Sequence, residues 1–110
     1  APGDRERMRD VLRYIDDHCC ADLRIDDLAR MACMSPTKFK ETFRRLNGRT
    51  LTRYVQGRRM SRAELLLRRP ELTIGRVART VGYTSASRFA ALFKREVGVL
   101  PSEYRERLDV

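Results

Sequence analysis

The sequence contains no tryptophan, one histidine and three cysteines among its 110 residues. His18 is the only histidine, and the sequence offers no candidate set of nucleophile, general base and carboxylate that places it in a plausible pocket, nor a cluster of metal ligands. His18 lies beside Asp16 and Asp17, and we expect it to be solvated. No glycine-rich phosphate loop is present either. The sequence therefore predicts neither an enzyme nor a resident cofactor or metal.

The cysteines exclude a disulfide framework. Cys19 and Cys20 are adjacent, Cys33 stands alone, and an odd number without a Cys-x-x-Cys pattern cannot pair completely. A reducing cytoplasm is the expected compartment. A metal site at Cys19 and Cys20 lacks a third ligand at useful spacing. A thiol-responsive sensor that uses all three cysteines stays open as an alternative function.

Long apolar runs are missing as well. No segment approaches the length of a membrane span, and no signal peptide precedes the first charged residues, so no membrane partner is expected. A hydrophobic content of 42% is nevertheless sufficient for a core, and the length fits one compact domain or two small ones. The abrupt start at Ala1 suggests a fragment, so we expect that a preceding domain is absent.

The charge is what the chain has in excess. The formal net charge is +9, and it is unevenly placed. Residues 1–27 hold five basic and eight acidic residues, whereas residues 28–110 hold 19 basic and seven acidic residues. Most of the excess is arginine, whose guanidinium group suits bidentate contacts to phosphate. The partner indicated is a polyanion, with nucleic acid ahead of a membrane.

Apolar residues recur at helical spacing along the whole chain, and no segment of convincing length alternates as a strand does. Start and stop signals divide the pattern: Ser35 and Pro36 open one helix, Asn47 and Gly48 close it, and Pro70 ends the longest one. The predicted fold is all-α, with helices at about residues 4–20, 25–31, 35–46, 50–69, 74–81, 85–96 and 101–108.

The second half of the chain repeats the first. An offset of 49 places Ile25 on Ile74, and after one inserted residue an offset of 50 places Phe39 on Phe89 and Gly48 on Gly98. Each copy is a short helix, a tight turn and a longer helix, which is a helix-turn-helix. A repeat that only builds a core has no need to collect cations on the faces left over after packing. Two matched copies in a basic chain therefore favour DNA binding.

The predicted subdomains are residues 5–49 and 70–108, joined by a linker helix at 50–69. A helix of about 20 residues spans ~30 Å. Successive major-groove faces on one side of B-DNA are ~34 Å apart. A single chain is therefore expected to bind a two-part site without forming a dimer.

The longer helices have predicted outward faces, because Phe39, Phe43, Phe89 and Phe93 point inward. The outward residues of the two helices are Pro36, Thr37, Lys40, Glu41 and Arg44, and Ala86, Ser87, Ala90, Ala91 and Lys94.

Several runs give the chain a resemblance to a known family over roughly residues 5–108. It resembles the C-terminal DNA-binding domain of the AraC/XylS transcriptional regulators. The matching runs are Arg59-Met60-Ser61-Arg62-Ala63-Glu64-Leu65-Leu66, Ile74-Gly75-Arg76-Val77-Ala78, Val81-Gly82-Tyr83, Phe89-Ala90-Ala91-Leu92-Phe93-Lys94-Arg95 and Gly98-Val99-Leu100-Pro101-Ser102-Glu103-Tyr104-Arg105.

The resemblance implies a bacterial regulator with a homeodomain-like fold of seven helices and two helix-turn-helix units. Its third and sixth helices would enter adjacent major grooves of promoter DNA, and it would activate transcription through RNA polymerase. The domain itself is expected to be monomeric, with any dimer formed through a missing N-terminal sensing domain. The DNA-binding residues implied by position are Pro36, Thr37, Lys38, Lys40, Glu41 and Arg44 in the first helix, and Ser85, Ala86, Ser87, Arg88, Ala91, Lys94 and Arg95 in the second.

Within these sets, Thr37, Lys40 and Glu41 are the implied base-facing residues of the first helix, with Arg44 nearer the backbone. Ser87, Arg88 and Ala91 are their counterparts in the second helix. The second helix departs from the family because Ala86, Ala90 and Ala91 replace larger polar residues, and alanine can only touch a thymine methyl or fit against the backbone. We therefore expect the first unit to discriminate bases more sharply, and the second to supply phosphate contacts and register.

Other residues have two readings each. Glu41 accepts from a cytosine amino group or pairs with Lys38 or Arg45 one turn away. Arg59 and Arg62 contact phosphate or anchor internal ion pairs. Tyr54 and Tyr104 are expected in the core. Cys33 stands where the other turn has Gly82, and cysteine is mildly unfavourable there if the turn needs a positive φ. A basic protein-interaction module is the remaining alternative to DNA binding.

Overall fold

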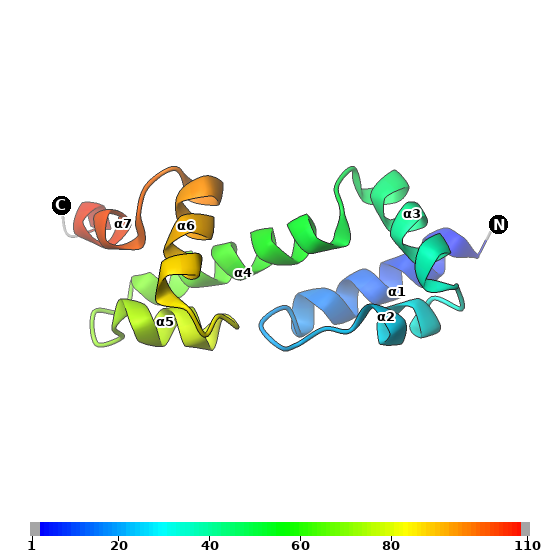
Figure 1. Ribbon diagram of the computed structural model, residues 1–110, viewed down its shortest axis with the longest axis horizontal. Coiled ribbons are helices and arrows are strands. Elements are labelled where there is room, and N and C mark those ends of the chain that lie inside the picture. The colour runs from blue at the N-terminus through cyan, green and yellow to red at the C-terminus, as the bar shows by residue number, and fades with distance from the viewer. Residues whose placement is uncertain (1–2, 109–110) are drawn as a thin grey trace. The chain divides into compact units, whose positions relative to one another are not determined.

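The computed structural model describes residues 3–108, and within that range it contains seven α-helices and no strand. Two compact units divide the chain, residues 1–55 (unit 1) and residues 56–110 (unit 2). The predicted all-α fold is confirmed. The helices, labelled in Figure 1, are α1 Asp4–Asp17, α2 Ile25–Met31, α3 Pro36–Asn47, α4 Leu51–Leu67, α5 Ile74–Thr80, α6 Ala86–Val97 and α7 Pro101–Leu108.

Two helices are shorter than predicted. α1 ends at Asp17 rather than at about residue 20. The backbone N–H of the next residue, His18, donates to the carbonyls of Tyr14 and Ile15 and closes the helix there. α4 has 17 residues, which corresponds to about 25 Å of rise rather than ~30 Å. Its last turn tightens, because the N–H of Arg69 bonds to Leu66 only three residues back.

The boundary between the units falls inside α4, between Val55 and Gln56. α4 is therefore not only a connection. Its first residues, Leu51 to Val55, belong to unit 1, and the remainder is the first helix of unit 2.

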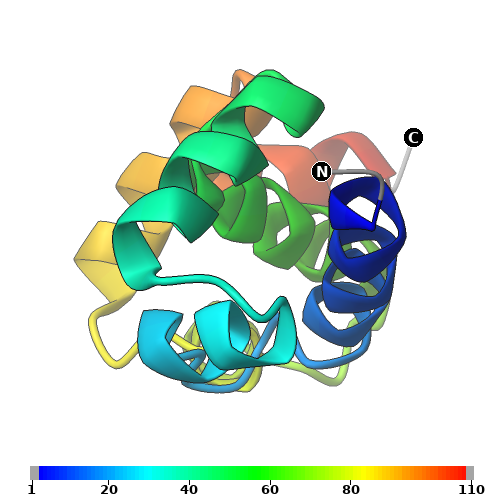
Figure 2. The ribbon, with the colours of Figure 1, turned by 90° about the vertical axis from the view of Figure 1, so that its right-hand side faces the viewer.

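In unit 1, α1, α2 and α3 surround one core (Figure 2). Phe39 and Phe43, one turn apart on α3, are both fully buried, and their ring centroids lie 5.9 Å apart. Tyr54 of α4 meets Phe43 edge-on at 5.5 Å, and its hydroxyl donates to the Asp16 carboxylate at 2.8 Å. The other buried members of the core are Met8, Val11, Ile15, Leu28, Ala29, Ala32 and Met34.

Unit 2 repeats this arrangement, with α6 packed against both α5 and α7 (Figure 1). Phe89 and Phe93 lie 5.8 Å apart, Tyr104 meets Phe93 edge-on at 5.5 Å, and the Tyr104 hydroxyl donates to Glu64 at 3.1 Å. Burial and the hydrogen bond to Glu64 raise the pKa of the Tyr104 hydroxyl above its usual range. Tyr104 is thus a packing residue, as predicted, with its polar end satisfied. Tyr54, its counterpart in unit 1, is a packing residue of the same kind.

The repeat also reaches further back than the sequence comparison showed. Asp16 of α1 and Glu64 of α4 hold the same role, and they are 48 residues apart. α1 is therefore the counterpart of the second part of α4. Arg105 of α7 caps the C-terminal end of α4, because its guanidinium donates to the carbonyls of Leu67 and Arg69.

The two helix-turn-helix turns have the same hydrogen bonds. After α2, the N–H of Met34 bonds to the carbonyl of Ala29 at 2.9 Å, and after α5 the N–H of Tyr83 bonds to Ala78 at 2.9 Å. Both are Schellman turns, in which the residue before the last donor adopts a left-handed conformation. That residue is Gly82, with φ 103°, in unit 2, but in unit 1 it is Cys33, with φ 57°.

Cys33 is the only non-glycine residue with positive φ in the described part of the chain. The left-handed region brings Cβ close to the carbonyl oxygen and costs about 1–2 kcal/mol for residues other than glycine. The cysteine side chain is exposed, so no buried packing compensates. The sequence expectation that cysteine is unfavourable at this turn is confirmed by the backbone geometry.

We predict that Cys33→Gly raises the free energy of unfolding by about 0.5–1 kcal/mol, because relief of the left-handed strain exceeds the added entropy of an unfolded glycine. Urea unfolding followed by circular dichroism under reducing conditions measures the change. Gly82→Ala, which imposes the same strain on the equivalent turn, is the matched control and should lower stability. A Cys33→Gly variant less stable than the parent chain would contradict the assignment.

Candidate nucleic-acid interface

Three features of the sequence fix where α3 begins and ends. The Ser35 hydroxyl accepts from the N–H of Lys38 at 3.2 Å, Pro36 occupies the first turn, and Gly48, with φ 77°, ends the helix. Between these ends, the two buried phenylalanines, Phe39 and Phe43, turn one face to the core. The opposite face is consequently solvent-exposed along its length.

α6 is positioned in the same way. The Ser85 hydroxyl accepts from the N–H of Arg88 at 3.1 Å, and Gly98, with φ 100°, ends the helix. Phe89, Leu92 and Phe93 are its buried residues. Both candidate recognition helices therefore have a capped start, a buried aromatic face and a glycine stop.

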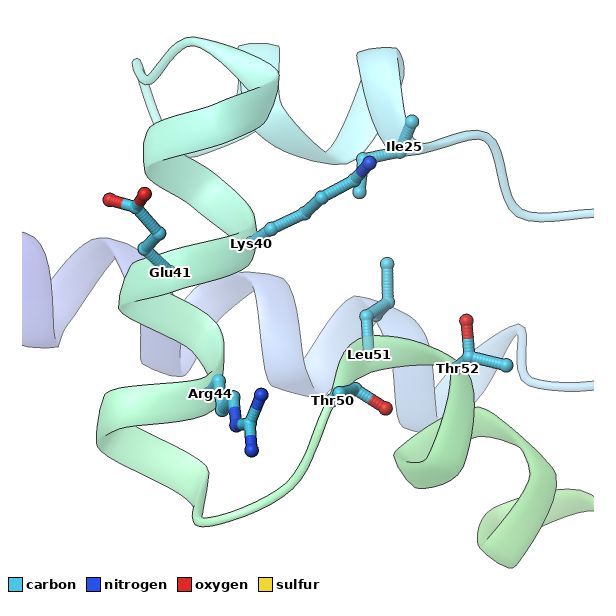
Figure 3. Close-up of a pocket in the computed structure, with 7 residues that line it drawn as sticks. All are labelled: Ile25, Lys40, Glu41, Arg44, Thr50, Leu51 and Thr52. Carbon is cyan, nitrogen blue, oxygen red and sulfur yellow. The ribbon is translucent and has the colours of Figure 1, made fainter.

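On α3, all five residues of the predicted outward face are exposed. Three of them, Lys40, Glu41 and Arg44, border a hollow of about 440 Å³ between α3 and the start of α4, with Ile25 of α2 on its far side (Figure 3). Lys40 extends toward Ile25, Arg44 lies near Thr50, and Glu41 points away from both (Figure 3). The exposed surface of α3 thus presents two cations and, on the other side, one carboxylate.

Lys38 lies on a different side of α3. Its ammonium group is 3.8 Å from the carboxylate of Asp4, the buried first residue of α1. Glu41 makes no ion pair with Lys38 or Arg45 among the residues that the structure describes. Of the two readings of Glu41, intramolecular pairing is therefore not observed.

On α6, the residues Ala86, Ser87, Arg88, Ala91 and Lys94 are exposed, as Ser85 is, while Ala90 is half-buried. Arg95 is also exposed, but its guanidinium donates to the Gln56 side chain of α4 and lies 3.3 Å from Glu96. Arg95 is thus engaged with its own unit. Lys94 belongs to the predicted outward face of α6, and Arg88 is exposed as well.

Two arginines of α4 had open roles. The Arg59 guanidinium carbon lies 5.1 Å from the centre of the Tyr83 ring, over its face, which is a cation–π contact. Arg59 thus makes an internal contact, to an aromatic ring, in addition to any ion pair. Arg62 is exposed.

Arg49 and Arg53 are not among the residues predicted from the sequence, yet the structure gathers them near Arg44. These three arginines, with Gly48 and Thr50, line a second hollow of about 400 Å³ at the corner between α3 and α4. The signal was present in the repeat, because the aligned positions in the second half, Val99 and Glu103, are not basic. The sequence prediction missed Arg49 and Arg53 because it considered residues of the two recognition helices alone.

The three cysteines follow the ends of α1 and α2. The Cys19 and Cys20 sulfurs are 3.7 Å apart after the end of α1, with Cys19 buried, while Cys33 occupies the exposed turn after α2. Within residues 3–108, no group of three or more potential ligands is close enough to hold a metal ion. No helix in the same range is long and apolar enough to cross a membrane.

The chain is similar to known DNA-binding proteins. Residues 28–107 match the family model described as a helix-turn-helix domain. The chain is 34% identical to the regulatory protein SoxS of Escherichia coli K12, covering 92% of this chain and 94% of SoxS. It is 36% identical to the arabinose operon regulatory protein of Salmonella typhimurium, covering 90% of this chain but 36% of that longer protein.

A solved structure shares the fold. The DNA-binding domain of AdpA, a global transcriptional factor crystallised in complex with a target DNA, superposes with a TM-score of 0.84 at 26% sequence identity. The match covers 92% of this chain and 91% of that one.

Proposed function

The chain belongs to the AraC/XylS family of DNA-binding transcriptional regulators, and we propose that it binds promoter DNA with α3 and α6 in adjacent major grooves. The observation that carries the proposal is the pair of matched helix-turn-helix units. In each unit a capped helix buries two phenylalanines and leaves a cationic face exposed. A helix so mounted is of the size that the major groove admits.

In this proposal α3 reads bases. Lys40 can donate to the O6 and N7 acceptors of guanine, Glu41 can accept from the amino group of cytosine, and the Thr37 methyl can contact a thymine methyl. Lys40 and Glu41 point in different directions from the helix (Figure 3), so they address different base pairs. The absence of an ion pair between Glu41 and its helical neighbours leaves its carboxylate available for this contact.

α6 has a different part. Ser87 and Arg88 are its polar candidates for base contact, and Ala86 and Ala91 permit a close approach to the groove floor. Lys94 is suited to a phosphate contact. Since alanine discriminates little beyond a thymine methyl, we assign the sharper base preference to α3.

The remaining parts of the proposal concern the whole protein. We propose that it activates transcription by contact with RNA polymerase in the bacterial cytoplasm, where its DNA target lies. The chain spans about a third of the arabinose operon regulator that it resembles. A separate N-terminal domain would then carry signal sensing and any dimerisation, with this domain monomeric.

Selection of bound sequences from a random duplex pool tests the proposal directly. The expected result is a non-palindromic motif in two parts, whose centres are separated by about one helical turn, 10–10.5 base pairs. Base preference should be stronger in one part than in the other. Enrichment of no sequence, or of one short part alone, would contradict the placement of both helices in adjacent grooves.

We predict that Lys40→Ala relaxes base preference at a single position of the selected motif, at a cost of about 1–3 kcal/mol in binding free energy. The reason is that a lysine bound to guanine is a directional contact, whose loss removes discrimination at that base pair only. Selection repeated with the variant measures it. An unchanged motif would show that Lys40 does not read bases.

We predict that Arg44→Ala weakens binding to all duplexes by a similar factor, and lowers the slope of log affinity against log salt by about one unit. A phosphate contact carries no sequence information, so the selected motif should stay the same. Fluorescence anisotropy over a salt series gives the slope. Loss of discrimination at one base pair would instead make Arg44 a base reader.

A thiol-responsive role is the second candidate function, favoured by the 3.7 Å separation of the Cys19 and Cys20 sulfurs. If oxidation of this pair disturbs the core around Cys19, mild oxidant should weaken DNA binding reversibly. A chain with Cys19, Cys20 and Cys33 all replaced by serine should then lose the response. The same response in that variant would end the hypothesis.

A further inference from the structure

The corner between α3 and α4 brings three arginines of unit 1 together. Arg44, Arg49 and Arg53 line its hollow of about 400 Å³, together with Gly48 and Thr50. All three arginines are exposed, and none of the described residues that line the hollow is acidic. Three guanidinium groups around one concave surface form a place where an anion is attracted from several sides.

The backbone explains why these arginines converge. Gly48, at φ 77°, reverses the chain between the last turn of α3, which carries Arg44, and the first turn of α4, which carries Arg53. The Thr50 hydroxyl accepts from the N–H of Arg53 at 3.2 Å and holds the start of α4. The positive end of the α4 dipole adds to the field, but the guanidinium groups carry the argument.

Unit 2 has the same corner without the same charge. The offset of 50 places Arg44, Arg49 and Arg53 on Lys94, Val99 and Glu103. The three positions therefore carry a formal charge of +3 in unit 1 and zero in unit 2.

Total charge does not account for the difference. Residues 1–55 hold 12 basic and nine acidic residues, an excess of +3, whereas residues 56–110 hold 12 basic and six acidic residues, an excess of +6. The unit with the lower overall charge has the more basic corner. Position, not composition, distinguishes the two corners.

We propose that the α3–α4 corner of unit 1 is a binding site for the sugar–phosphate backbone of duplex DNA, with Arg44, Arg49 and Arg53 contacting phosphates, and that unit 2 lacks its equivalent. The inference rests on the proposed reading of bases by α3, since Arg44 and Thr50 border this hollow and also the one beside Lys40. Unit 1 then supplies backbone contacts as well as base discrimination. This adds to the expectation, based on the alanines of α6, that unit 2 supplies phosphate contacts and register.

The test compares salt dependence among single variants of the chain. Fluorescence anisotropy gives the affinity for two labelled duplexes, the selected site and a shuffled duplex of equal length, over 50–200 mM NaCl. Arg49→Ala and Arg53→Ala should each lower the slope of log affinity against log salt by about 0.9 for one lost phosphate contact. Both duplexes should weaken by the same factor. Circular dichroism melting checks that each variant remains folded.

Two further variants separate a built site from general charge. Arg13→Ala removes the same charge from an exposed position on α1 of the same unit and should leave the slope unchanged. Val99→Arg adds a cation to the corner of unit 2 and should steepen the slope by a similar amount. The proposal is overturned if Arg49→Ala and Arg53→Ala match Arg13→Ala, or if they weaken the selected site alone.

The outcomes also distinguish this inference from the function beneath it. If the parent chain binds both duplexes equally, with little dependence on salt, the proposed function fails. If the parent chain prefers its selected site and has a steep slope, but the corner variants behave as Arg13→Ala does, only the corner site fails.

Discussion

Each unit depends on one packing arrangement, in which two phenylalanines a helical turn apart meet a tyrosine edge-on. In unit 1 the helix that carries Phe39 and Phe43 cannot rotate about its axis without exposing an aromatic ring. Exposure of such a side chain costs on the order of 1.5–3 kcal/mol. The same contact that stabilises the core therefore decides which residues of the recognition helix face solvent. The same aromatic ladder, two phenylalanines and a tyrosine, recurs in unit 2 with nearly identical ring separations. α3 and α6 are therefore presented in the same way within their units.

On that shared frame the two units differ in the side chains that their exposed positions carry. The caps, the aromatic ladder, the hydroxyl-to-carboxylate bonds and the Schellman turns are held in common. Outward positions differ: Lys40 stands against Ala90, and Arg49 against Val99. A surface residue can change without cost to the fold, so base reading and backbone binding can be distributed unequally between two copies of one scaffold. A family of regulators built on this frame can alter its target by changing a few exposed side chains.

Local sequence patterns predicted the helices and turns well, but not every helix end. Capping residues, prolines and glycine stops are local signals, and they located the helices and both helix-turn-helix units correctly. The end of α1 was placed some three residues too late, since hydrophobic periodicity continues to Cys19, which is buried although it lies beyond the helix. The cysteine at the first turn was recognised as unfavourable only through comparison with Gly82. Its left-handed backbone follows from the hydrogen bond that closes the turn.

The sequence by itself determined the all-α fold, the duplication, the inward aromatic residues and most of the exposed candidates on α3 and α6, because these follow from periodicity and from comparison of two copies. Only the tertiary structure decided the partners of individual charges. It engaged Arg95 with Gln56, placed Lys38 beside Asp4 and laid Arg59 over Tyr83. It also brought Arg49 and Arg53 to the same corner as Arg44. Such contacts join residues on different helices, and no periodicity within one helix specifies them.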